Sequence, residues 1–175
     1  SIVLITIQVD SEKNDGGGTG FVIARRNNKA LILTNHHVIT TSTENRSVEA
    51  INVEWFSELK DGEYCRQSAR LIQHDKQRDL ALIEVDNVPD DIKPLKLNPA
   101  ELDEGSEVTI IGHPDLDDSP WSVVTGKIAS IVSRLQIDAT VQEGNSGSPV
   151  FDKRDRVIGI LTQSQPPVEG SNATG

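Results

Sequence analysis

The sequence Gly144-Asn145-Ser146-Gly147-Ser148-Pro149-Val150 places a serine in a glycine-rich turn. Glycine reaches backbone conformations that are closed to other residues, so such a turn can be tight enough to hold the serine hydroxyl outward. The backbone N–H groups of Gly144 and Ser146 can then converge on one point, which is the layout of a nucleophile beside an oxyanion hole. Turns rich in glycine and serine are common, so an ordinary loop is the alternative interpretation of this stretch alone.

Short apolar segments separated by polar turns recur along the chain, and none shows convincing helical periodicity. Aromatic residues are few and methionine is absent, so Ile, Val and Leu must fill the core, and β-branched residues favour strands. The pattern predicts an all-β sandwich or barrel. The segments expected to form strands are 2–9, 20–24, 30–34, 48–55, 69–73, 80–85, 107–112, 121–133, 135–140, a short one at Val150, and 157–162.

A proline-punctuated stretch over residues 88–99 has no periodicity and is the candidate linker between two halves. It divides the chain into an N-terminal unit over 1–96, a C-terminal unit over 97–165 and a tail over 166–175. The polar, proline-containing tail is expected to be frayed or to lead into a further domain.

The composition excludes several classes of partner and site. A net charge of -10, from 27 acidic and 17 basic residues, argues against binding to nucleic acid or to an anionic membrane. Cys65 is the single cysteine, so no internal disulfide is expected, and bacterial cytoplasm or periplasm fits better than a disulfide-rich secreted setting. No apolar run is long enough to span a membrane. His74 and His113 are isolated from each other, so we predict no metal site and no cofactor.

Three motifs occur in a fixed order: Thr34-Asn35-His36-His37-Val38, then Asp79-Leu80-Ala81-Leu82, then the turn around Ser146. Together they resemble the active-site motifs of chymotrypsin-fold serine peptidases. Gln136-Ile137-Asp138-Ala139 is similar to the bacterial HtrA-type branch, and the Ser146 turn is similar to the V8-like glutamyl endopeptidases. The resemblance implies two six-stranded antiparallel β-barrels packed together, with the active site in the cleft between them.

The resemblance also implies a role for each motif residue. Ser146 is expected to be the nucleophile, His37 the general base and later acid, and Asp79 the group that orients the imidazole. The amides of Gly144 and Ser146 are expected to bind the oxyanion. His36 is the competing base, but the motif gives the role to His37; on a continuous strand His36 would face the opposite way.

Two positions depart from the pattern of the digestive members of the family. Asn145 stands where those members have an aspartate that pairs with a newly cleaved N-terminus, so activation by N-terminal trimming is not expected. Ser148 stands where most of the family has glycine, but V8-like members accept serine there, so it is no sign of inactivity.

Alignment with the family places five residues around the primary specificity pocket: Thr140, Val141, Thr162, Gln163 and Ser164. No acidic residue lies at its base, which disfavours Arg or Lys before the cleaved bond. Leu161 stands where V8-like members have a histidine, which argues against a preference for glutamate. The sequence therefore predicts cleavage after small or medium uncharged residues such as Val, Ala, Thr or Leu.

The sequence thus predicts a serine endopeptidase acting on protein or peptide substrates. The alternative is a binding module on the same fold whose site is silenced or unassembled, because a fold does not fix a function. The presence of His37, Asp79 and Ser146 together favours the enzyme. The enzyme is compatible with a third interpretation, in which the chain is the protease domain of a longer protein and its tail leads to a regulatory or peptide-binding domain; an activator protein is a further candidate partner.

Overall fold

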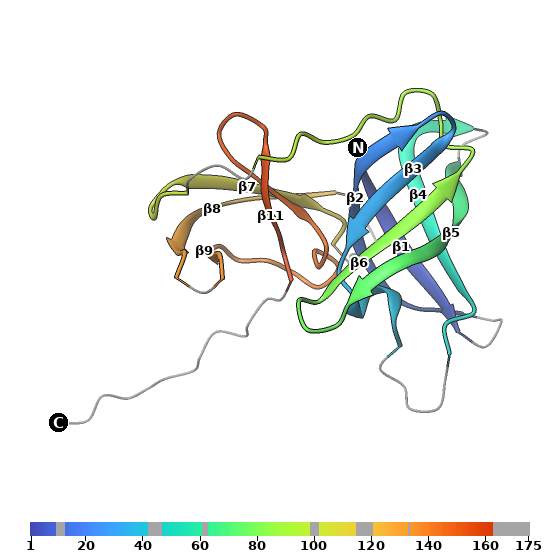
Figure 1. The fold of residues 1–175 in the computed structure, drawn as a ribbon, viewed down its shortest axis with the longest axis horizontal. Helices are drawn as coiled ribbons and strands as arrows, with labels where there is room; N and C mark the ends of the chain where they lie inside the picture. The colour runs from blue at the N-terminus through green and yellow to red at the C-terminus, as the bar shows by residue number, and fades with distance from the viewer. Residues whose placement is uncertain are drawn as a thin grey trace.

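The computed structural model describes residues 1–9, 13–41, 47–60, 63–98, 102–114, 121–132 and 134–162, and almost all of its regular structure is antiparallel strand (Figure 1). One short 3-10 helix, η1 (His37–Ile39), interrupts the strands. The described part holds no helix that is long and apolar enough to cross a membrane. Its strands are β1 (Ile2–Val9), β2 (Lys13–Arg26), β3 (Lys29–Thr34), β4 (Ala50–Lys60), β5 (Glu63–Asp75), β6 (Leu80–Asp86), β7 (Glu107–Gly112), β8 (Ser122–Ser130), β9 (Gln136–Asp138), β10 (Pro149–Phe151) and β11 (Val157–Ile160).

The first six strands close into an antiparallel barrel in the order β1-β2-β3-β6-β5-β4, with β4 pairing back onto β1. Buried and less buried residues alternate along β1, β3 and β6, as expected for strands with one face in a core. The barrel interior is filled by branched aliphatic side chains and one tryptophan, among them Val3, Ile5, Ile7, Val22, Ile32, Val53, Trp55, Ile83 and Val85. The expected composition of the core is therefore confirmed.

The second unit is an antiparallel sheet in the order β11-β10-β7-β8-β9, curled over a smaller core that contains Val108, Ile110, Ile128 and Val150. The all-β class is confirmed, but the described residues form five strands here, where a second six-stranded barrel was expected. The strands β9 and β10 have three residues each, because residues 139–148 between them form turns around Ser146 and do not extend either strand.

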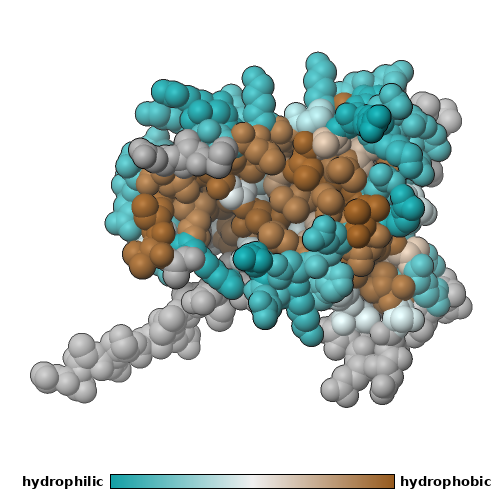
Figure 2. Space-filling model, viewed as in Figure 1, coloured by the Kyte–Doolittle hydropathy of each residue, from teal (hydrophilic) through white to brown (hydrophobic). Residues whose placement is uncertain are grey.

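Apolar side chains from both units meet in a third cluster. Phe21 of β2, Phe151 of β10 and Val157 of β11 are buried there, and Leu95 of the connecting segment packs against them. Figure 2 shows hydrophobic residues spread across one face of the molecule, over the second sheet and the adjoining barrel. Burial of this apolar surface holds the two units together, since the hydrophobic contribution scales with the area removed from water.

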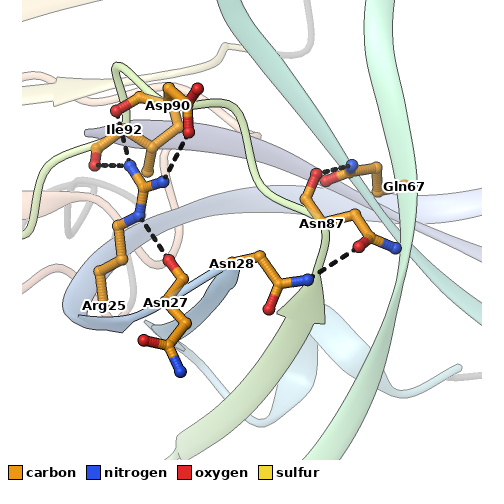
Figure 3. Close-up of polar contacts among 7 residues, drawn as sticks. All are labelled: Arg25, Asn27, Asn28, Gln67, Asn87, Asp90 and Ile92. Carbon is orange, nitrogen blue, oxygen red and sulfur yellow. Dashed lines mark hydrogen bonds and ion pairs between the residues drawn. The ribbon is translucent and has the colours of Figure 1, made fainter.

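The connection between the two units is attached to the barrel. The guanidinium of Arg25 donates hydrogen bonds to the carbonyl oxygens of Asp90 (2.7 Å) and Ile92 (3.0 Å), as Figure 3 shows. The amide of Asn28 donates to Asn87 Oδ1 at 2.9 Å, just beyond β6. The start of the predicted linker is thus held against the β2–β3 hairpin.

Further along, the same segment bonds to both units. The N–H of Leu95 donates to the carbonyl of Val22 in β2 at 2.8 Å. One residue later, the carbonyl of Lys96 accepts from Val157 in β11 at 2.8 Å, and the N–H of Asn98 returns a bond to Val157 at 2.9 Å. The segment therefore joins the barrel and the second sheet through backbone hydrogen bonds on both sides.

The turn between β10 and β11 is organised by one carboxylate. Asp152 Oδ1 accepts from the N–H groups of Arg154 (2.9 Å) and Arg156 (3.0 Å). Asp152 Oδ2 accepts from the guanidinium of Arg156 through Nη2 (2.6 Å) and Nε (2.9 Å). The hydrogen bonds from the Arg156 side chain lower the pKa of Asp152 from 3.8 to about 2. The charged form of this carboxyl is thus favoured in the folded state.

We expect Asp152→Asn to lower the melting temperature at pH 7. The difference from the wild type should shrink as the pH falls from about 4 to about 2. The carboxyl has a lower pKa in the folded than in the unfolded chain, so its contribution is complete above the unfolded pKa and is lost as the pH falls through the folded value. Melting temperatures of both proteins across this pH range test it, with Asp91→Asn as the control for loss of one exposed carboxylate. A difference that does not change with pH would contradict the prediction.

Candidate active site

Pairing of β3 with β6 brings His37 and Asp79 together. The ladder ends at Thr34 and Ala81, so the chain leaving β3 lies beside the residue that enters β6. His37 Nδ1 lies 2.7 Å from Asp79 Oδ2, and the His37 N–H donates to Asp79 Oδ1 at 2.9 Å. With Nδ1 carrying the proton toward Asp79, the tautomer leaves Nε2 with a free lone pair that can accept a proton.

The aim of the Asp79 carboxylate depends on an unusual backbone conformation. Asp79 has a φ of 56°, in the left-handed region that aspartate tolerates better than most residues. The side-chain amide of Asn35, which is fully buried, donates to the carbonyl of Asp79 at 2.8 Å. Asn35 therefore holds the backbone of Asp79 while His37 engages its side chain.

The sequence predicted that His36 lies on a strand, but the structure places it outside β3. Strand β3 ends at Thr34, and His36 adopts a helical conformation at the start of η1. Its ring stacks on that of His74 at a centroid distance of 4.9 Å. Partial burial and, second, the neighbouring His74 lower the pKa of His36. Of the two adjacent histidines, His37 is the one that contacts the Asp79 carboxylate.

The turn that carries Ser146 requires glycine at position 147. Gly147 has a φ of 85°, and a Cβ on it would overlap the carbonyl oxygen of Thr19 and lie 2.6 Å from Thr34 Oγ1. Its N–H donates to the carbonyl of Leu161 at 2.9 Å. The turn thus lies directly against the barrel on one side and the end of β11 on the other.

The backbone N–H groups of this turn differ in whether they donate a hydrogen bond within the protein. Those of Asn145 (3.3 Å) and Ser148 (3.0 Å) donate to carbonyls within the turn. Among the described residues, those of Gly144 and Ser146 have no hydrogen-bond acceptor. Gly144 has a φ of 84°, which glycine adopts without strain. These two N–H groups, which were predicted to form an oxyanion hole, are therefore free to bind a ligand oxygen.

Gly18 places Ser146 next to the helix that contains His37. A Cβ on Gly18 would lie 2.8 Å from the carbonyl oxygen of Ser146 and 2.8 Å from Cγ2 of Val38. Val38 follows His37 in η1, so the two segments approach the same glycine from the two units. His37 and Ser146, both described, make no hydrogen bond to each other. Catalytic hydrogen bonds are often long in unliganded sites and tighten when substrate binds.

The predicted specificity residues lie close to the turn along the chain. Thr140 is exposed, and Val141 is half-buried against the core of the second sheet. Thr162 is half-buried and follows Leu161, whose N–H donates to the carbonyl of Ser148 at 2.9 Å. Gln163 and Ser164 lie outside the described residues. The described residues contain no group of three or more acidic, histidine or cysteine side chains that could hold a metal ion.

The sequence singled out Asn145 and Ser148 by comparison with the family, but it did not predict that polar residues are buried beneath the turn. Asn145 and Ser148 are fully buried, and the hydroxyl of Ser122 lies 3.2 Å from Asn145 Oδ1. A Cβ on Gly112 would overlap Ser148 Oγ and lie 2.7 Å from Asn145 Oδ1. Thr19, also fully buried, bonds to the turn from β2. The one local signal for Thr19 is its place between Gly18 and Gly20, which allows close approach on both sides.

Comparisons with known proteins show the family of the chain. A family model described as trypsin-like peptidase domain matches residues 18–160. The chain is 32% identical over 164 residues to a probable periplasmic serine endoprotease, DegP-like, of Halomonas elongata, which covers 89% of this chain and 31% of the relative. It is 29% identical over 119 residues to Protease Do-like 1, chloroplastic, of Arabidopsis thaliana, covering 61% of this chain and 27% of the relative.

The same fold occurs in solved structures. The crystal structure of the serine endoprotease from Yersinia pestis superposes with a TM-score of 0.71 at 24% sequence identity, covering 94% of this chain and 54% of that one. This likeness confirms the fold expected from the motifs. The chain spans less than a third of the length of the two curated relatives.

Replacing Gly147 with Ala should destabilise the protein more than the same change at Gly105. Both residues have positive φ values, of 85° and 83°, so alanine at either position is destabilised by about 1–2 kcal/mol in the left-handed conformation. A Cβ on Gly105 meets nothing within 4 Å, whereas one on Gly147 overlaps Thr19, which should cost about 1–3 kcal/mol more. Urea unfolding of both variants measures the difference. Equal losses of stability would mean that the turn can move away from the barrel without cost.

Proposed function

Because the chain belongs to the trypsin-like peptidase domain family, we propose that it is an endopeptidase of the HtrA type that works through Ser146, His37 and Asp79. The observation that carries this proposal is the 2.7 Å contact between His37 Nδ1 and Asp79 Oδ2. It is supported by the free N–H groups of Gly144 and Ser146 on the neighbouring turn.

In the proposed mechanism the hydroxyl of Ser146 attacks the carbonyl carbon of the substrate while His37 Nε2 takes its proton. A serine hydroxyl is a weak nucleophile at neutral pH, so it needs a base that removes the proton as the bond forms. Asp79 holds the imidazole in the required tautomer and stabilises the imidazolium without taking its proton. His37 then gives the proton to the leaving amine, and the acyl-enzyme is hydrolysed when His37 activates a water molecule in the same way.

The N–H groups of Gly144 and Ser146 are proposed to bind the oxygen on which negative charge develops. Donors of this kind act in the transition state, and loss of one costs about 3 kcal/mol in other serine proteases. Since these N–H groups have no acceptor in the described structure, substrate binding would not have to break an internal hydrogen bond first. This supports a turn that is ready to bind the oxyanion without an activator.

For specificity, we propose small or medium uncharged residues on the acyl side of the cleaved bond. Thr140, Val141 and Thr162 contribute hydroxyl and aliphatic groups, and none of the predicted pocket residues is charged. A charged substrate side chain would therefore have no partner of opposite charge to offset its loss of hydration.

The chain is proposed to be the protease domain of a longer protein. It spans less than a third of the two curated relatives, so residues 166–175 are proposed to lead toward a regulatory or peptide-binding domain. Its partners would be protein or peptide substrates, with regulation by that domain or by an activator. A bacterial cytoplasmic or periplasmic setting is proposed, since the relative from Halomonas elongata is named as periplasmic.

A fluorophosphonate probe should label the purified chain, and Ser146→Ala and His37→Ala should abolish the labelling. The reason is that the probe reacts with a serine that a neighbouring base activates. Asp79→Asn should slow labelling by about 10⁴-fold, the loss of turnover that this change causes in the archetype of the family. Labelling rates followed by gel fluorescence measure all four proteins. A folded wild-type chain that is not labelled would favour the binding-module alternative.

Digestion of a peptide library should enrich cleavage after Val, Ala, Thr and Leu. The predicted pocket is uncharged, so charged side chains lose hydration without gaining a partner. Mass spectrometry of the products identifies the cleaved bonds, and a digest with Ser146→Ala removes cleavage due to contaminants. Predominant cleavage after Glu, Lys or Arg would show that the pocket assignment is wrong.

A further inference from the structure

Thr19 is the residue at which the barrel, the second sheet and the Ser146 turn meet, and all of its polar groups are bonded. Its N–H donates to the carbonyl of Ser146 at 2.8 Å, and its hydroxyl donates to the carbonyl of Gly144 at 2.9 Å. Its hydroxyl oxygen accepts from the N–H of His113 at 2.9 Å, and its carbonyl accepts from Thr34 Oγ1 at 2.7 Å. Thr19 and Thr34 are both fully buried.

The direction of the bond between Thr19 and Gly144 is fixed by its neighbour. The N–H of His113 can only donate, so the Thr19 oxygen accepts there, and its single proton remains for the carbonyl of Gly144. A carbonyl can only accept, so the pair cannot be reversed. Thr19 is fully buried, so a substitution that removes its hydroxyl takes one hydrogen bond from each of these two partners.

These bonds fix two peptide planes on either side of the Ser146 N–H. The carbonyls of Gly144 and Ser146 both accept hydrogen bonds from Thr19. These bonds hold the Gly144–Asn145 and Ser146–Gly147 peptide groups in place. The peptide between them has its own carbonyl, that of Asn145, accepting from Ser148 at 3.0 Å. A planar trans peptide directs its N–H opposite to its carbonyl. The N–H of Ser146 is thereby turned away from the carbonyls inside the turn.

We propose that Thr19 is a positioning residue, whose hydroxyl and N–H hold the Gly144 and Ser146 carbonyls so that the oxyanion-binding N–H of Ser146 stays directed at the substrate. This inference rests on the proposed function, because it concerns the rate of the step at Ser146. Thr19 itself touches no reacting atom. Its effect passes through the backbone of the turn, so its loss should lower kcat more than it raises KM.

Comparing Thr19→Val with Thr19→Ser separates the effect of the hydroxyl from the effect of side-chain packing. Valine keeps the shape of threonine but leaves the Gly144 carbonyl without its donor, whereas serine keeps the donor. We expect Thr19→Val to lower kcat about 10- to 100-fold with KM changed less than about threefold, and Thr19→Ser to keep kcat within about threefold of wild type. Thr109→Val is the matched control, since the Thr109 hydroxyl on β7 has no hydrogen-bond partner among the described residues.

Crystal structures of the variants provide a readout that does not depend on turnover. The Gly144 carbonyl should rotate away from position 19 in Thr19→Val and stay in place in Thr19→Ser and Thr109→Val. If the valine variant does not fold, Thr19→Ala removes the same hydroxyl without an added methyl group beside the carbonyl.

The two readouts keep the inference distinct from the proposed function. An unchanged Gly144 carbonyl in Thr19→Val, or a serine variant as impaired as the valine variant, would overturn the role of Thr19 even in an active enzyme. Failure of the wild type to react with the fluorophosphonate probe would instead overturn the role of Ser146. In that case the carbonyl orientation still decides whether Thr19 holds the turn.

Discussion

The position of the Ser146 turn against the barrel depends on the hydrogen bonds of one buried threonine. Thr19 bonds to the turn at Gly144 and Ser146, to the barrel through Thr34, and to the end of β7 through the N–H of His113. An unpaired polar group at a position without water costs about 1–3 kcal/mol. Each of these partners therefore constrains the others, and a shift of one unit against the other would break several bonds at once.

Apolar contacts and hydrogen bonds contribute differently to this arrangement. The cluster around Phe21 and Phe151 holds the two units together, but apolar burial is non-directional and tolerates small rotations. The hydrogen bonds at Thr19 have preferred angles and lengths, so they select one relative orientation. The site between the units thus takes its stability from the first set of contacts and its geometry from the second.

Local patterns in the sequence predicted the strands and the motif order but not the contacts between distant segments. The short apolar segments predicted an all-β sandwich or barrel, the family resemblance predicted the barrel, and the glycines around Ser146 indicated a tight turn. The place of His36 was missed because β3 ends at Thr34, and periodicity does not report where a strand stops. Thr19 and Gly144 are 125 positions apart, so nothing local links them. The catalytic roles of His37, Asp79 and Ser146 stay predictions.

The proline-punctuated connection has a consequence for how this chain could be divided. Its backbone bonds to Val22 in the barrel and to Val157 in the second sheet, and Arg25 fastens its start. It is therefore a shared edge of both units and not a tether of adjustable length. Dividing the chain at this segment would remove hydrogen bonds from each fragment and expose the apolar cluster around Phe21. The two units thus share this segment structurally, and a split reporter or a swapped half would have to carry it with both of its neighbours.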